Sequence, residues 1–180
     1  EIRDWFVDEL SPISILQSLI SNPTAQLSSV RVGCMKEILV IGYGNTFRRD
    51  DGAGVVLAQQ LVACWQPQTP VRLVTGTQLV PELAIDIAAA DVGAVVFVDA
   101  SMGEVNEQIH VQRVVGDIGL PVLGHQLGPA ALLIYASLFN ARNLPAWLVT
   151  APGVDFGHGE GLSPAVQQQL SAAPKIANHL

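Results

Sequence analysis

Residues 38–54 of the chain read ILVIGYGNTFRRDDGAG. The stretch begins as an apolar run typical of a buried strand. It breaks at Gly42 and Gly44, and then presents Asp50 and Asp51 where a helix is predicted to begin. A strand that ends in Gly-x-Gly commonly leads to a phosphate bound at the start of the next helix. Two adjacent carboxylates would repel a phosphate, so the stretch indicates a different kind of ligand.

The composition predicts a single α/β domain and excludes several classes of protein. The chain has 180 residues, of which 49% are hydrophobic and 14% charged, so it is not a disordered chain. A net charge of −7, with nine scattered Lys and Arg residues, argues against a nucleic-acid partner. Apolar runs such as residues 92–98 are too short to cross a bilayer, so no membrane association is expected. Cys34 and Cys64 form no C-x-x-C pair, and we expect two free thiols in the cytoplasm.

The chain divides at about residue 34. Residues 1–34 do not resemble a signal peptide, because their first residues are not basic, and they are predicted to be an N-terminal extension of uncertain role. Met35 stands directly before a charged pair and a strand, as at the start of a compact domain. Residues 35–180 are therefore predicted to form the α/β domain.

Hydrophobic spacing predicts the order β-α-β-α-β, then a hairpin-like strand, then α-β-α. Strands that are apolar on both faces, separated by helices, imply a sheet covered on both sides. The predicted fold is one three-layer α/β domain, with a mostly parallel twisted sheet of about five strands. The predicted strands are 37–41, 71–74, 94–98, 108–115 and 146–150, and the predicted helices are 52–65, 81–90, 126–139 and 164–176, the last with a Ser163 cap.

Three polar residues are predicted to lie at the same edge of this sheet. Asp51 follows the first strand, Asp99 ends the third, and His125 precedes a helix. Sites in open α/β sheets form outside the carboxyl ends of the strands, so these side chains are expected to converge. Two carboxylates and an imidazole suit a borderline divalent metal.

Each of these residues also has a purely structural interpretation. Acids favour helix N-termini, so Asp50 or Asp51 can serve as a cap. We expect Asp50 to cap the following helix and Asp51 to face the site. Asp99 can accept hydrogen bonds from backbone N–H groups in a turn, and His125 can cap a helix or be a buried structural imidazole. Of the other histidines, His110 is predicted to lie at an exposed or edge position and His158 on a surface loop.

The dinucleotide-binding alternative fails on particular residues. Phe47 occupies the position of the third glycine, and the second strand ends without an acid for the ribose. A Ser-His-Asp hydrolase is excluded as well, because the chain contains no G-x-S-x-G elbow.

Taken in order, the motifs GYGN at 42–45, DDGAG at 50–54, Asp99-Ala100 and HQL at 125–127 resemble the hydrogenase maturation proteases. The match runs from about Ile38 to the last helix and includes GLSP at 161–164. The chain resembles most the members that serve bidirectional, NAD-linked nickel-iron hydrogenases. Such enzymes are endopeptidases that remove a C-terminal peptide from the hydrogenase large-subunit precursor after nickel insertion.

By this resemblance, Asp51, Asp99 and His125 are the catalytic and metal-contacting residues, and the nickel arrives with the precursor. Two departures from the family stand out. Some members have glutamate at the position of Asp51, and many have an aspartate where this chain has residues 75–78, TGTQ. We expect a monomer that binds the precursor. The alternative is a non-enzymatic metal-binding chaperone that docks on a metalloprotein precursor with the same three residues.

Overall fold

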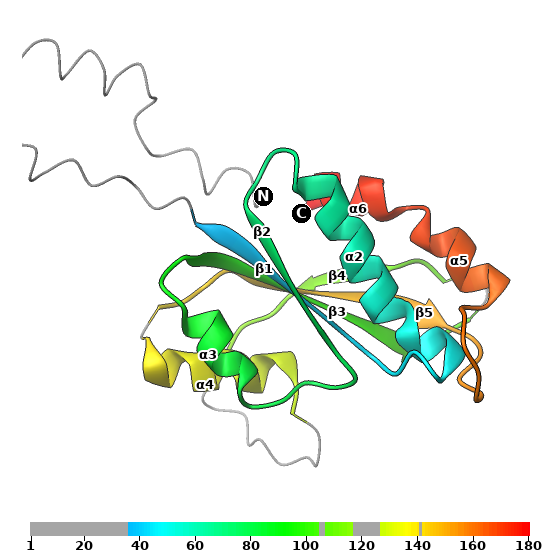
Figure 1. Ribbon diagram of the computed structural model, residues 1–180, viewed down its shortest axis with the longest axis horizontal. Helices are drawn as coiled ribbons and strands as arrows, with labels where there is room; N and C mark the ends of the chain where they lie inside the picture. The colour runs from blue at the N-terminus through cyan, green and yellow to red at the C-terminus, as the bar shows by residue number, and fades with distance from the viewer. Residues whose placement is uncertain (1–35, 105–106, 117–126, 141) are drawn as a thin grey trace, which may run out of the picture.

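The computed structural model describes residues 36–104, 107–116, 127–140 and 142–180. These residues form a five-stranded sheet with the order β2-β1-β3-β5-β4 (Figure 1). Strands β1, β2, β3 and β5 run parallel, and β4 is antiparallel to β5. The strands are β1 (Glu37–Tyr43), β2 (Val71–Gly76), β3 (Val92–Met102), β4 (His110–Arg113) and β5 (Ala146–Gly153).

Helices cover both faces of the sheet (Figure 1). One face carries α2 (Ala53–Trp65), α5 (Pro164–Leu170) and α6 (Ala173–His179), and the other carries α3 (Leu83–Ala88) and α4 (Pro129–Phe139). A short 3₁₀ turn, η3 (Arg49–Gly52), joins β1 to α2. The predicted single three-layer α/β domain with a mostly parallel sheet is therefore confirmed.

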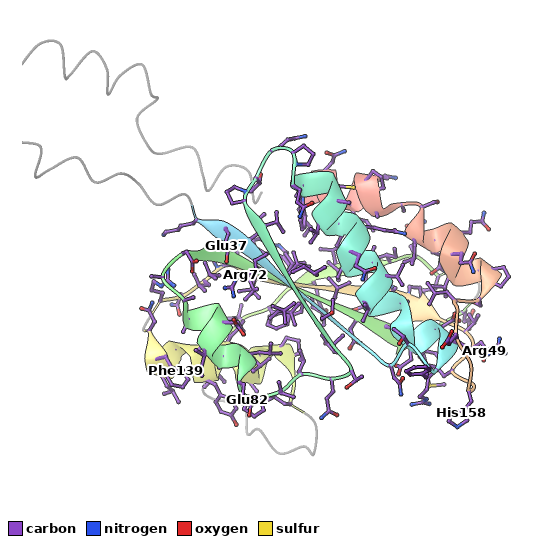
Figure 2. All side chains as sticks on the ribbon, in the orientation of Figure 1. Glu37, Arg49, Arg72, Glu82, Phe139 and His158 are labelled. Carbon is purple, nitrogen blue, oxygen red and sulfur yellow. The ribbon has the colours of Figure 1, made fainter. Side chains whose placement is uncertain are left out.

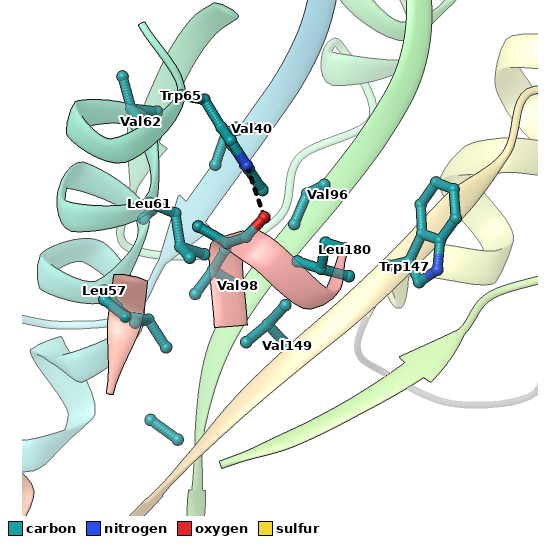
Figure 3. Close-up of a cluster of buried hydrophobic side chains, with 14 of the residues drawn as sticks. Val40, Leu57, Leu61, Val62, Trp65, Val96, Val98, Trp147, Val149 and Leu180 are labelled. Atoms are coloured by element: carbon teal, nitrogen blue, oxygen red, sulfur yellow. Dashed lines mark hydrogen bonds between the residues drawn. The ribbon is translucent and has the colours of Figure 1, made fainter. Parts of the chain in front are cut away.

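Two buried clusters account for the two-sided apolar pattern of the central strands. Alternate residues of β3 divide between them: Val96 and Val98 pack under α2, whereas Val95 and Phe97 pack under α3 and α4. Trp65 closes the first cluster, since its indole Nε1 donates to the carbonyl oxygen of Ala177 at 3.0 Å and links α2 to α6 (Figure 3). We refer to these clusters as the α2 face and the α4 face.

The last predicted helix is the clearest error of the sequence analysis. A single helix over 164–176 is wrong, because the chain forms α5 and α6 with a break between them. Pro174 lies in the first turn of α6, where its missing N–H and fixed φ are tolerated; inside a longer helix it would break the hydrogen-bonding pattern. The predicted start is confirmed, since the Ser163 hydroxyl accepts from the backbone N–H of Val166.

Other boundaries differ by a few residues from the prediction. β4 is shorter than the predicted 108–115, α3 is shorter than 81–90, and β3 and β5 extend further at their carboxyl ends. Within the described part of the chain, no helix has the length and apolar character needed to span a membrane. Cys64 is a free thiol, as predicted, whereas Cys34 and the whole extension 1–34 lie outside the described residues.

Candidate functional site

The loop after β1 is shaped so that Asp51 is held at the carboxyl edge of the sheet. Gly44 has a φ of +136°, and a Cβ there would collide with the backbone of Asp51, so only glycine fits. The backbone N–H of Asn45 donates to Asp51 Oδ2 at 3.1 Å. Asn45 Oδ1 accepts in turn from the N–H of Phe47 at 3.0 Å. The glycine turn and the asparagine together fix the carboxylate of Asp51 in place.

Asp99 lies beside this loop, near the carboxyl end of β3. Its Oδ1 accepts from the N–H of Ala100 at 2.8 Å, and its carboxylate also bonds with the hydroxyl of Tyr43. Burial raises the pKa of Asp99, and the nearby charge of Asp51 adds to the rise, although both hydrogen bonds oppose it. The charge effect means that the carboxylate of Asp51 lies close enough to Asp99 to disfavour its ionised form.

Tyr43 is a neighbour of the site that the sequence analysis missed. Burial and the charge of Asp99 both raise the pKa of the Tyr43 hydroxyl, so it stays protonated and donates to the carboxylate. Its signal in the sequence is its place between two glycines at the end of a strand, on the same face as Ile41. That pattern does not reveal its partner, because the contact depends on how β1 and β3 align.

Gly54 sets the distance between the two carboxylate-bearing segments. A Cβ at this position would lie 2.8 Å from Asp99 Cα and 2.8 Å from the carbonyl oxygen of Val98, and still closer to the carbonyl of Tyr43. These are backbone atoms, so they cannot move aside as a flexible side chain would. The start of α2 therefore packs directly against the ends of β1 and β3.

Gly54→Ala is expected to separate Asp51 from Asp99 and to destabilise the fold by about 1–3 kcal/mol, the usual cost of overpacking. Any activity that needs both carboxylates should fall by more than the loss of folded protein explains, because a displacement of about 1 Å can cost ~100-fold in rate. Thermal unfolding and activity measured on the same preparation check this. Normal activity of the folded variant would contradict the tight-packing argument.

Asp50 is a structural residue, but it does not cap α2 as predicted. The N-cap position of α2 is Gly52, and no side chain caps it. Asp50 is fully buried instead. It accepts from the N–H groups of Val154 and Asp155 at 2.9 Å each, and from the N–H and hydroxyl of Ser163 at 2.6 and 2.8 Å. It therefore joins the loop after β1 to the loop after β5 and to the start of α5.

Further contacts bind these two loops together. The N–H of Arg49 donates to the carbonyl of Gly159 at 3.0 Å, and the Arg49 guanidinium lies 3.3 Å from the carboxylate of Asp155. Arg49 and His158 accordingly lie near one another at one end of the molecule (Figure 2). His158 is exposed on its loop, as predicted. His110 is exposed on the edge strand β4, also as predicted.

The third predicted site residue, His125, lies outside the described residues. No cluster of three or more His, Cys, Asp or Glu side chains suited to a metal occurs in the described part of the chain. Among those residues the candidate site thus consists of Asp51 and Asp99, two oxygen donors that a third ligand would complete. Two cavities, of about 300 and 630 Å³, are lined by neither carboxylate.

The described fold agrees with solved structures of one kind. The maturation protease HycI of nickel-iron hydrogenase from Thermococcus kodakarensis is 25% identical, with a TM-score of 0.59 over 80% of this chain and 89% of that one. The described residues have the fold of the hydrogenase maturation proteases. The Escherichia coli hydrogenase maturating endopeptidase HybD is 24% identical, with a TM-score of 0.55 over 78% of this chain and 88% of that one.

At the level of sequence alone the chain is more distant from known proteins. No family model matches it, and no curated protein matches it. A solution structure of an endopeptidase from Escherichia coli is 25% identical with a TM-score of 0.55, covering 78% of this chain and 88% of that one. The family resemblance stated from the motifs is thus confirmed by these structural similarities.

Proposed function

We propose that the protein is an endopeptidase that removes the C-terminal peptide of a nickel-iron hydrogenase large-subunit precursor after nickel insertion. The observation that carries the proposal is the placement of Asp51 beside Asp99 at the carboxyl edge of a sheet with this fold. The names of the similar structures support processing of a hydrogenase. We also propose that the precursor belongs to a bidirectional, NAD-linked hydrogenase, and this part of the proposal rests on the sequence motifs alone.

In this proposal the nickel belongs to the substrate. The carboxylates of Asp51 and Asp99 and the imidazole of His125 add ligands to a nickel ion that the precursor already holds. Nickel then acts as a recognition element, because precursor without the metal lacks part of the binding energy. Ligation requires Asp99 to be ionised, and burial raises the pKa of Asp99, so its ionised form is less favoured than that of an exposed aspartate.

Hydrolysis of the peptide bond needs an activated water. Two routes remain open: nickel polarises the peptide carbonyl, or a carboxylate accepts the proton of the attacking water. Asp99 suits the second route, since burial raises the pKa of its carboxyl group above the ordinary value and a more basic carboxylate accepts a proton more readily. The Tyr43 hydroxyl then holds the Asp99 carboxylate in one orientation. We further propose that the enzyme acts as a monomer in the cytoplasm.

The test compares nickel-loaded with nickel-free precursor, each mixed with the purified protein, and determines the mass of the precursor's C-terminal fragment. We expect the loaded precursor to be shortened and the nickel-free precursor to remain intact. Equal cleavage of both would remove nickel recognition from the proposal. Binding without any shortening would favour the chaperone alternative.

A further inference from the structure

A row of polar side chains crosses the sheet at the level of Asp99. Strand pairing places Asp99 of β3 opposite Thr150 of β5, and Thr150 opposite His110 of β4. Tyr43 lies on the other side of Asp99, one residue beyond the paired Gly42 and Val98. Residues paired across a sheet direct their side chains to the same face. We call Tyr43, Asp99, Thr150 and His110 the polar row.

The polar row faces the α4 side of the sheet. Ile41, Phe97 and Leu148, each two residues before a member of the row, pack in the α4-face cluster, and side chains two apart on a strand share a face. On β4, Val111 packs on the α2 face, so its neighbour His110 points to the α4 face. All four side chains are partly or fully exposed, whereas Ile41 and Phe97 are buried.

The length and chemistry of the row match an extended peptide. Neighbouring strands lie about 4.8 Å apart, so the three intervals from Tyr43 to His110 span about 14 Å. Extended chain covers about 3.3–3.6 Å per residue, so roughly four residues fit along the row. In the described structure the Thr150 hydroxyl makes no hydrogen bond, and the His110 ring bonds only Glu107, at 3.2 Å through Nε2.

We propose that Thr150 and His110 bind the precursor's peptide chain on one side of the bond that is cut. The proposal rests on the proposed function, because that reaction must bring a peptide to Asp99, and the two residues continue outward from Asp99 along one line. The Thr150 hydroxyl and the His110 imidazole each bond a peptide N–H or carbonyl of the substrate. They contribute to binding and recognition rather than to the chemical step.

The first test compares kinetic constants for nickel-loaded precursor. The double variant Thr150→Val and His110→Ala is expected to raise KM by about tenfold and to leave kcat within about twofold. This corresponds to two hydrogen bonds of somewhat under 1 kcal/mol each. Thr150→Val keeps the shape of the side chain, so the sheet should fold normally. The matched control is His179→Ala, which removes an exposed imidazole near the end of α6.

An unchanged KM in a folded double variant that still cleaves precursor would overturn the proposed binding row and leave the proposed function standing. An equal rise in KM for His179→Ala would overturn it too.

The second test does not depend on cleavage: a photoreactive benzophenone residue replaces His110, and the cross-linked precursor is mapped by mass spectrometry. Cross-links to the precursor's C-terminal region support the row even if no cleavage occurs. Cross-links absent or confined to other regions contradict it.

Discussion

Asp99→Asn is expected to lower the rate of precursor cleavage by at least about 100-fold without loss of the fold. Asparagine keeps the size of the side chain but removes the negative charge needed for nickel ligation or for proton transfer, a step worth ~100-fold or more. Asp51→Asn should have a similar effect, because its carboxylate lies at the same site. Cleavage rates measured with nickel-loaded precursor give the magnitude.

Stability separates loss of function from loss of structure in these variants. Asp51 accepts one hydrogen bond, from Asn45, which the side-chain oxygen of asparagine can still accept. The melting temperatures of both variants should therefore stay close to the unmodified protein, and removing the charge at Asp99 relieves a buried ionisable group. If both folded variants process the precursor at normal rates, the assignment of the two carboxylates is wrong.

Asp50→Asn, unlike Asp51→Asn and Asp99→Asn, is expected to destabilise the fold, by about 3 kcal/mol or more. The amide replaces one acceptor oxygen by an N–H₂ group that faces the N–H groups already bonded there. Leaving a buried donor without a partner costs ~1–3 kcal/mol, and here more than one donor is affected. Chemical denaturation of this variant beside Asp51→Asn provides a matched pair at adjacent positions. Equal stability of the two variants would refute the structural role of Asp50.

The same hydrogen bonds predict how stability depends on pH. Burial alone would raise the pKa of Asp50, but the bonds from Ser163, Val154 and Asp155 together outweigh burial and lower it. A lowered pKa in the folded state contributes stability that is complete above the ordinary pKa of about 3.9, and that is lost as the pH falls through the folded value. The stability difference between the unmodified protein and Asp50→Asn should therefore shrink in acid. A constant difference below pH ~4 would contradict this.

The fold was predictable because the apolar residues of the strands and helices follow clear patterns in the sequence. The run at residues 92–98 has no polar interruption, which only a strand covered on both faces explains, and it forms β3 between β1 and β5. The final helix was mispredicted because its apolar spacing received more weight than Pro174. Within a short stretch, a proline that forbids continuation is stronger evidence than a continuing pattern.

The site was predictable only in part, because some of its residues contact partners that lie far away in the sequence. Asp51 follows β1 and Asp99 lies near the carboxyl end of β3, and parallel strands end at one edge, so their proximity follows from the topology. The role of Asp50 does not, because its partners lie 104 to 113 residues away in sequence. Tyr43 and the polar row depend on strand register, which is fixed by the packed faces and not by any local motif.

The hydrogen bonds that Asp50 accepts from Ser163 indicate when, during folding, the loop after β1 gains its contact with α5. One partner, Ser163, donates two hydrogen bonds to Asp50 and lies beyond every strand of the sheet, so the loop that bears Asp51 gains these bonds only when α5 docks. A chain emerging from the ribosome would complete its sheet before that contact exists, because such long-range closure comes late. The loop that bears Asp51 would thus gain its contact with the start of α5 as one of the last events of the protein's own synthesis.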